Sequence, residues 1–204
     1  MAKVALIPKL DRFLPYLLIF VGIVGVLSAF IITQDKFALL QNPNFKPSCS
    51  LNPVLSCGSV MKSAQSNAFG FSNPYIGLIG YPVLITTGVV MLAGAQLKRW
   101  YYLGLNAGLL FGIGFVHWLF FQSVYSIHAL CIYCMAVWVV TITAFWYVTL
   151  YNLQHGHLKL PAKLKPVGLF ARRHHLDILV LWFLIIIGLI LHHFWYYFGK
   201  HLPF

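Results

Sequence analysis

The sequence predicts an all-α membrane protein, in which four transmembrane helices form a bundle under an extracytoplasmic cysteine loop with a half-helix cap, and a fifth transmembrane helix follows. Composition is the first reason. Of the 204 residues, 60% are hydrophobic and 8% are charged, whereas a soluble domain carries about 25% charged residues. Five apolar runs are the second reason, because each reaches the roughly 20 residues that cross a bilayer. This composition excludes a soluble domain and a disordered chain.

The positions of the five apolar runs suggest that the chain has three segments. The runs cover residues 13–33, 74–97, 100–121, 128–151 and 178–198. The three acidic residues lie at the ends of these runs, as the cost of burying a charge in lipid requires; they are Asp11, Asp35 and Asp177. We expect residues 1–151 to form the four-helix bundle, 152–177 a basic cytoplasmic loop, and 178–204 the fifth helix with a short tail.

The basic residues are distributed as membrane topology requires. The net charge is +11, from 14 Lys and Arg against 3 Asp and Glu. No basic run alternates with aromatic residues as in a nucleic-acid-binding domain, so we expect no nucleic-acid partner. With the N-terminus in the cytoplasm, ten basic residues fall inside and four outside, which satisfies the positive-inside rule. The ten are Lys3, Lys9, Arg12, Lys98, Arg99, Lys159, Lys163, Lys165, Arg172 and Arg173, and the four are Lys36, Lys46, Lys62 and Lys200.

The third run carries three regularly spaced glycines and two polar residues. Gly104, Gly108 and Gly112 recur every fourth residue. Such a stripe lets two membrane helices approach closely, so we expect it at a helix–helix contact. His117 and Gln122 are polar groups in the same run and need hydrogen-bond partners, which the sequence alone does not name.

The longest segment between the runs, residues 34–73, is expected to cover one end of the bundle. Pro43, Pro47 and Pro53 prevent a single continuous helix. The rest of the segment is largely uncharged and partly apolar, which suits a cap that folds back over the bundle. Residues 56–68 have the length and composition of a short helix on the membrane surface.

The four cysteines fall into two pairs on the outer side of the membrane. Cys49 and Cys57 lie in the loop, in CSLNPVLSC, and Cys131 and Cys134 form CIYC at the outer end of the fourth run. Two pairs in an oxidising compartment favour disulfide chemistry. A CxxC pair at a helix start can form a reducible disulfide, and the helix N-terminus stabilises a thiolate. A four-cysteine metal site and purely structural disulfides remain as alternatives, although a CxxC disulfide closes too short a loop to stabilise much.

The sequence around these cysteines resembles the vitamin K epoxide reductase family, and most closely its bacterial homologues. The resemblance rests on FKPSCSLNPVLSCGSVMKSAQSNAFGFSNPYIGLIGYP and the later ALCIYC, and covers about residues 14–151. The shared pattern is two cysteines separated by seven residues, a serine six residues further on, Phe-Gly, an asparagine, and the later CxxC. The resemblance implies a bundle around a quinone in the bacterial inner membrane, with all four cysteines on the periplasmic side.

The resemblance also implies roles for single residues. Cys131 and Cys134 correspond to the active-site pair, with Cys134 next to the quinone, and Cys49 and Cys57 to the shuttle pair. Asn73 corresponds to an asparagine that hydrogen-bonds a quinone carbonyl, although its place before Pro74 also suits a helix cap. Ser63 corresponds to a serine or threonine beside the active site, although it suits an ordinary surface position equally well. Met61 and Ile76 fall at pocket-lining positions.

One departure from the animal members bears on the substrate. Trp138 stands where those members have a tyrosine that holds the vitamin K ring. An indole N–H can donate a hydrogen bond, but it does not replace a phenol. We therefore include Trp138 in the pocket and expect a quinone of the ubiquinone or menaquinone type.

Together these observations predict a membrane thiol:quinone oxidoreductase that supports disulfide bond formation. It would reoxidise a periplasmic thioredoxin-fold protein similar to DsbA. We expect this partner to be a separate chain, because no thioredoxin-like domain follows the fifth run as it does in several relatives. The alternatives are a vitamin K epoxide or quinone reductase proper and a four-cysteine metal-binding membrane protein. We assign no metal ligand.

Overall fold

The computed structural model describes residues 10–199 and shows an all-α protein. Lys3, Lys9 and Lys200, three of the basic residues counted for topology, lie outside the described residues. Among the described residues, five helices are long and apolar enough to cross a membrane. The helices in chain order are α1 (Leu10–Gln41), α2 (Cys57–Lys62), η1 (Ala64–Asn67), α3 (Pro74–Leu92), α4 (Arg99–Phe121), η2 (Gln122–Ile127), α5 (Ile132–Gln154), η3 (Ala162–Leu164), α6 (Lys165–Arg173), α7 (His175–His193) and α8 (Trp195–Phe198).

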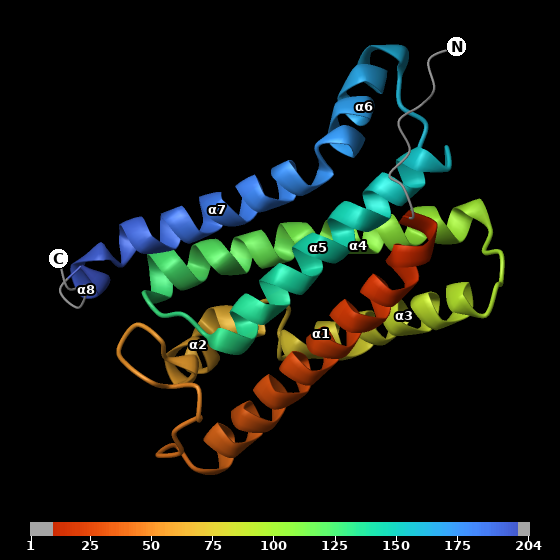
Figure 1. Cartoon of the computed structure of the whole chain (residues 1–204). Helices are drawn as coiled ribbons and strands as arrows, with labels where there is room; N and C mark the ends of the chain where they lie inside the picture. The colour runs from red at the N-terminus through yellow and green to blue at the C-terminus, as the bar shows by residue number, and fades with distance from the viewer. Residues whose placement is uncertain (1–9, 200–204) are drawn as a thin grey trace.

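Helices α1, α3, α4 and α5 form the bundle, and the cysteine loop covers one end of it. Helix α1 packs along α3 on one side and against α5 on the other, and α5 packs against α4. Figure 1 shows the loop with α2 at one end of the bundle and α6 at the opposite end. Helix α7 runs beside the bundle and meets it at few points. The predicted four-helix bundle with a cap and a fifth membrane helix is therefore the architecture observed.

Several predicted boundaries were wrong, and two of the differences have a local cause in a left-handed residue. Helix α1 continues past residue 33 to Gln41, and α3 ends at Leu92 because Gly94 adopts the left-handed conformation with φ 79°. Helix α5 begins at Ile132, because His128 is also left-handed, with φ 56°. The fifth helix breaks at Phe194, and the segment expected as a basic loop contains α6. The predicted helix over residues 56–68 is divided at Ser63 into α2 and η1.

The close approach of α1 to α3 depends on glycines that the sequence did not single out. A Cβ at Gly88 of α3 would lie 2.5 Å from the backbone oxygen of Pro15, and one at Gly22 of α1 would lie 2.5 Å from Ile85. The predicted stripe behaves differently. Only Gly112 approaches another helix, with Thr141 3.3 Å from its would-be Cβ, and Gly104 and Gly108 have nothing within 4 Å. The prediction that the stripe packs against a helix is therefore wrong for Gly104 and Gly108.

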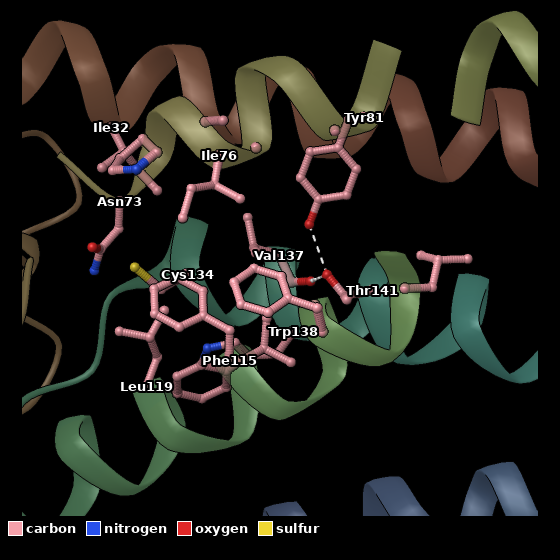
Figure 2. Close-up of a pocket in the computed structure, with 18 of the residues that line it drawn as sticks. Ile32, Asn73, Ile76, Tyr81, Phe115, Leu119, Cys134, Val137, Trp138 and Thr141 are labelled. Atoms are coloured by element: carbon pink, nitrogen blue, oxygen red, sulfur yellow. Dashed lines mark hydrogen bonds between the residues drawn. The ribbon is translucent and has the colours of Figure 1, made fainter. Parts of the chain in front are cut away.

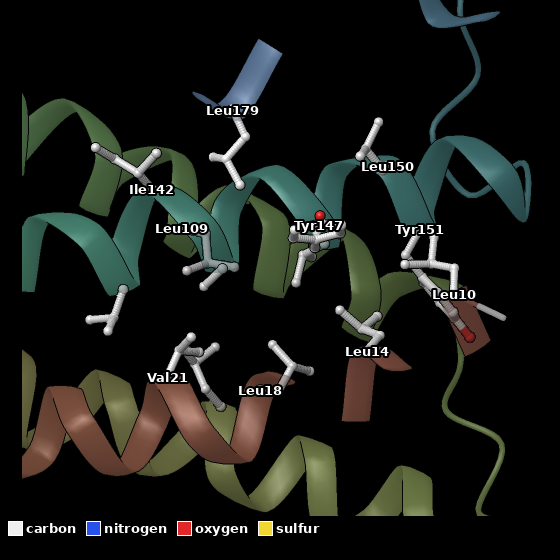
Figure 3. Close-up of a cluster of buried hydrophobic side chains, with 14 of the residues drawn as sticks. Leu10, Leu14, Leu18, Val21, Leu109, Ile142, Tyr147, Leu150, Tyr151 and Leu179 are labelled. Atoms are coloured by element: carbon white, nitrogen blue, oxygen red, sulfur yellow. The ribbon is translucent and has the colours of Figure 1, made fainter. Parts of the chain in front are cut away.

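The main apolar core lies between α1, α4 and α5, at the end of the bundle opposite the cysteine loop. Figure 3 shows side chains from α1 facing those from α5, with Leu109 of α4 and Leu179 of α7 beside them. Because lipid is as apolar as these side chains, close packing rather than removal from water stabilises this contact. The core residues contributed by α1 and α5 in Figure 3 include Leu10, Leu14, Leu18, Val21, Ile142, Tyr147, Leu150 and Tyr151.

Polar contacts attach α7 to the bundle. Trp182 Nε1 donates a hydrogen bond of 3.0 Å to His117 Nε2, which gives His117 the partner its position requires. Trp146 Nε1 bonds the His175 carbonyl at the start of α7, and the His128 and His193 rings are 2.9 Å apart, nitrogen to nitrogen, at its end. Phe194, just after α7, is fully buried in a cluster with Val54 and Trp138. The fifth helix is thus part of the folded unit.

Candidate active site

A short backbone bridge attaches the cysteine loop to the start of α5. Leu55 pairs with Leu130 in parallel, and two backbone bonds flank the pair: Ser56 N–H to the Leu130 carbonyl, 2.9 Å, and Leu130 N–H to the Val54 carbonyl, 2.7 Å. Asn52 supports the loop, because its Oδ1 accepts from the N–H groups of Val54 and Leu55. Since Cys57 and Cys131 each follow this bridge directly, it sets the two cysteine pairs side by side.

The two cysteine pairs meet in one buried cluster. Cys49 and Cys57 are joined in a disulfide with Cα atoms 5.7 Å apart, and Cys131 and Cys134 are free thiols. Cys57 and Cys131 are 0% exposed and Cys49 is 5% exposed. Ile32 and Leu39 of α1 complete the cluster. Of these three cysteines, Cys49 is therefore the most exposed residue.

Cys131 occupies the N-cap position of α5, and its surroundings favour the thiolate. The Cys134 thiol donates a hydrogen bond to the Cys131 sulfur and lowers the pKa of Cys131 below its ordinary value. Backbone N–H groups of Tyr133 and Cys134 act in the same direction, whereas burial and the Asp35 carboxylate oppose ionisation. A buried sulfur that is stabilised as the anion is suited to thiol–disulfide exchange.

Below the cluster lies a cavity of about 490 Å³, and Cys134 is the cysteine that lines it. Its walls come from α1, α3, α4, α5 and the loop, and they are mainly apolar. This volume is typical of a site for a small organic molecule. Every residue assigned to the pocket from the sequence lines the cavity, namely Met61, Ser63, Asn73, Ile76 and Trp138. Figure 2 shows Asn73 beside Cys134, with Trp138 and Phe115 further along the wall.

Asn73 and Ser63 have structural contacts in addition to facing the cavity. The Asn73 amide donates to the Gln65 carbonyl at 2.7 Å and accepts from Ala68 N–H at 2.9 Å. Asn73 occupies the N-cap position of α3, as the alternative predicted, but its side chain makes no capping hydrogen bond there. An amide carries two N–H donors, which leaves one for a ligand. The Ser63 hydroxyl donates to the Val60 carbonyl at 2.7 Å, and its oxygen can still accept a hydrogen bond.

The sequence did not identify two hydroxyl groups of the cavity wall. Tyr81 of α3 and Thr141 of α5 both line the cavity, and their oxygens are 2.7 Å apart. A signal was available, because Thr141 follows Cys134 by seven residues and so lies on the same face of α5. Lys36 also lines the cavity, and its ammonium group bonds Ser66 Oγ at 2.8 Å and Asn67 Oδ1 at 2.7 Å. The glycines Gly104 and Gly108 line the same space.

The arrangement of possible metal ligands can be stated for the described residues. Within residues 10–199, no group of three or more His, Cys, Asp or Glu side chains lies close enough together to hold an ion. The four cysteines are instead divided between a disulfide and a thiol pair.

Comparison with known families agrees with this geometry. The model of the vitamin K epoxide reductase family matches residues 16–149, which contain all four cysteines and the residues of the cavity wall named above. The chain belongs to the vitamin K epoxide reductase family. No curated protein matches the chain in a sequence search.

Membership of the vitamin K epoxide reductase family gives the site a general chemistry. The protein is a multi-pass membrane oxidoreductase of a family that combines thiols with quinones. The cavity suits a quinone, because a flat apolar ring with polar oxygens requires apolar walls, a few hydrogen-bonding groups and a sulfur within reach. Cys134, Asn73 and the apolar lining supply these three features.

Proposed function

We propose that this protein transfers electrons from the thiols of a thioredoxin-fold protein to a membrane quinone, and so supports disulfide bond formation. One observation carries the proposal: of the four cysteines, which lie together at one end of the bundle, only Cys134 opens onto the apolar cavity. Electrons that enter at the loop disulfide therefore have one sulfur through which to reach a substrate in the membrane.

The first exchange takes place at the loop disulfide. A thiolate of the partner attacks Cys49, the more exposed residue of the pair, and Cys57 leaves as a thiolate. The second thiol of the partner then attacks the mixed disulfide, which releases the oxidised partner and the Cys49 thiol. Since Cys49 is only 5% exposed, the loop has to open for this attack.

The second exchange passes the electron pair to the bundle. With Cys131 and Cys134 joined in a disulfide, the Cys57 thiolate attacks Cys131, and Cys134 leaves as a thiolate. Cys49 then attacks Cys57, which reforms the loop disulfide and leaves Cys131 as a thiol. The lowered pKa of Cys131 makes it a good leaving group in this last step. The bridge between Leu55 and Leu130 holds the reacting sulfurs near one another.

The final step reduces the quinone. The Cys131 and Cys134 thiols give up two electrons and two protons and become a disulfide, and the quinone takes up the same electrons and protons to become the quinol. The side chains that line the cavity near Cys134 exclude water from this reaction. We propose that Met61, Ile76 and Trp138 form apolar walls, and that Asn73 and Ser63 meet the quinone oxygen nearest Cys134.

The charge distribution supports a periplasmic position for the cysteine end. Among the described residues, eight Lys and Arg lie toward the α6 end of the bundle and three toward the cysteine end. Positive residues favour the cytoplasmic side. We therefore propose that the cysteine loop faces the periplasm of a bacterial inner membrane, where disulfides persist, and that the quinone is of the ubiquinone or menaquinone type.

Quinone reduction by the purified protein tests the proposal. A reduced thioredoxin-fold protein serves as the donor, and the ultraviolet absorbance of ubiquinone or menaquinone reports turnover. We expect Cys134→Ala to abolish turnover. In this variant Cys131 attacks Cys57 of the loop disulfide, so a Cys57–Cys131 disulfide should accumulate, with Cys49 left free for alkylation.

Cys57→Ala is the matched control for trapping, since it cannot form that disulfide. Peptide mapping under non-reducing conditions distinguishes the two variants. Equal accumulation of a Cys131-containing disulfide in both would show that the order of the cysteines is wrong. Absence of turnover with either quinone in folded wild-type protein would overturn the proposed function itself.

A further inference from the structure

The part of the cavity next to Cys134 has a second polar end, opposite the one formed by Asn73 and Cys134. Tyr81 and Thr141 form this second end, and Figure 2 shows their hydroxyl groups joined across the cavity from α3 and α5. Ile76, Val137 and Phe115 lie between the two ends. This part of the cavity therefore has apolar sides and hydrogen-bonding groups at both ends, and the cavity continues past Tyr81 toward Trp100 and Tyr101.

The separation between the two polar ends is similar along α3 and along α5. Asn73 lies at the start of α3 and Tyr81 lies within it, eight residues further on, which corresponds to a rise of about 12 Å. Cys134 and Thr141 are seven residues apart on α5, which corresponds to about 10 Å. The α3 side thus contributes one residue to each polar end, and so does the α5 side. Asn73 faces Cys134 and Tyr81 faces Thr141 across the cavity.

The Tyr81 hydroxyl is held in position by three helices. The ring lies against Gly25 of α1, where a Cβ would overlap ring atoms, and a Cβ at Gly77 would come within 3.2 Å of the same ring. The hydroxyl is fixed at the other end by Thr141 of α5. A phenol packed in this way loses little further freedom when it binds a ligand.

The hydrogen bonds of this pair allow the phenol to turn to a ligand at low cost. Thr141 Oγ1 donates its proton to the Val137 carbonyl at 2.7 Å, so Tyr81 is the donor in the bond between the two hydroxyls. If the phenol proton turns toward the cavity, Thr141 keeps its bond to Val137 and no O–H donor is left unpaired. Tyr81 can therefore donate to an acceptor in the cavity.

We infer that Tyr81, positioned by Thr141, is a second ligand subsite that donates a hydrogen bond to the quinone oxygen remote from Cys134. A 1,4-quinone has the form that this cavity requires, with a flat apolar ring and an acceptor oxygen at each end. Asn73 meets one oxygen and Tyr81 the other. The subsite selects quinones with two opposed carbonyl groups. This inference rests on the proposed function, since it concerns the same substrate.

Tyr81→Phe tests the inference, because it removes the hydroxyl and keeps the ring against Gly25. We expect KM for a soluble 1,4-quinone to rise about two- to tenfold, the effect of one neutral hydrogen bond, while trapping of the Cys57–Cys131 disulfide in a Cys134→Ala background is unchanged. The infrared carbonyl band of bound quinone should shift to higher frequency as one hydrogen bond is lost. Thr141→Ser keeps the acceptor hydroxyl and should behave as wild type, whereas Thr141→Val removes the acceptor that competes with the quinone for the Tyr81 proton and should lower KM.

Tyr147→Phe is the matched control, since Tyr147 is a buried tyrosine of α5 whose hydroxyl bonds His175 away from the cavity. Should Tyr81→Phe not fold, Thr141→Val still tests the subsite. An unchanged KM and an unchanged carbonyl band in folded Tyr81→Phe would overturn the inference. That result differs from failure of the proposed function, in which wild-type protein itself would reduce no quinone.

Discussion

Single polar residues in this protein act by linking helices that apolar contacts alone would leave free to slide. Asn152 of α5 is fully buried, and its amide donates to the Tyr102 carbonyl and to Asn106 Oδ1 on α4. Its oxygen accepts from His157 Nδ1, 3.1 Å away. A polar group within a membrane requires such partners, and each bond fixes the register of two elements. The loop after α5 is thereby attached to α4.

His157 makes this attachment dependent on pH. Burial lowers the pKa of His157 from its ordinary 6.5, and the charges of His155 and Arg99 act in the same direction. The fold therefore favours the neutral ring, so its contribution to stability is complete above pH 6.5 and is lost as the pH falls below that value. We expect the thermal stability in detergent to fall as the pH drops from about 6.5 to about 5, and His157→Gln to reduce that fall. An equal loss in the variant and the wild type would show that His157 is not responsible.

At the scale of helices, a glycine is required for packing where the backbones of two helices come into contact. Gly22 and Gly88 bring α1 and α3 together, although neither belongs to a regular stripe. Gly104 and Gly108 do form a stripe, yet they border the cavity. A stripe shows only that a helix face is smooth, and that face can border a ligand as well as a neighbouring helix.

Gly88→Ala is expected to destabilise the bundle. The added Cβ would lie 2.5 Å from the Pro15 carbonyl oxygen and 2.7 Å from Ile19, so backbone must move. Overpacking of this kind costs about 1–3 kcal/mol, which a lower melting temperature in detergent would report. Gly80→Ala on the same helix is the control, since a Cβ there meets nothing within 4 Å. A similar loss in both variants would point to a change in α3 itself rather than at its contact with α1.

The limits of prediction from sequence follow from the same contacts. The membrane helices and the site residues Cys49, Cys57, Cys131 and Cys134 could be found, because long apolar runs and a spaced cysteine pattern are local signals. Tyr81 and Thr141 could not be paired in advance, since their bond joins positions 60 residues apart. The end of α3 and the start of α5 depend on left-handed residues at Gly94 and His128, which local composition marks only weakly.

At the scale of the whole molecule, the cap, the bundle and the cavity form one continuous path. The loop disulfide lies over Cys131, Cys134 opens below it, and the cavity continues between α3 and α4 to Trp100 and Tyr101 near the other end. The main apolar core of α1, α4 and α5 lies beside it. The cavity therefore runs along the α3–α4 side of the bundle while α1 and α5 pack against each other, and a ligand in the cavity should stabilise the whole fold.

A large side chain introduced at a glycine of α4 that lines the cavity tests whether a ligand in the cavity stabilises the fold. A quinone at about one hundred times its Kd should add about 2.7 kcal/mol to the stability of the wild type and raise its melting temperature. Gly108→Leu places a large side chain in the cavity and should abolish that rise while the protein still folds, because a Cβ at Gly108 meets nothing within 4 Å. Gly114→Leu lies on the same helix, has equally open surroundings and does not line the cavity, so it should keep the full rise. If Gly108→Leu retains the quinone-dependent rise, the ligand binds elsewhere.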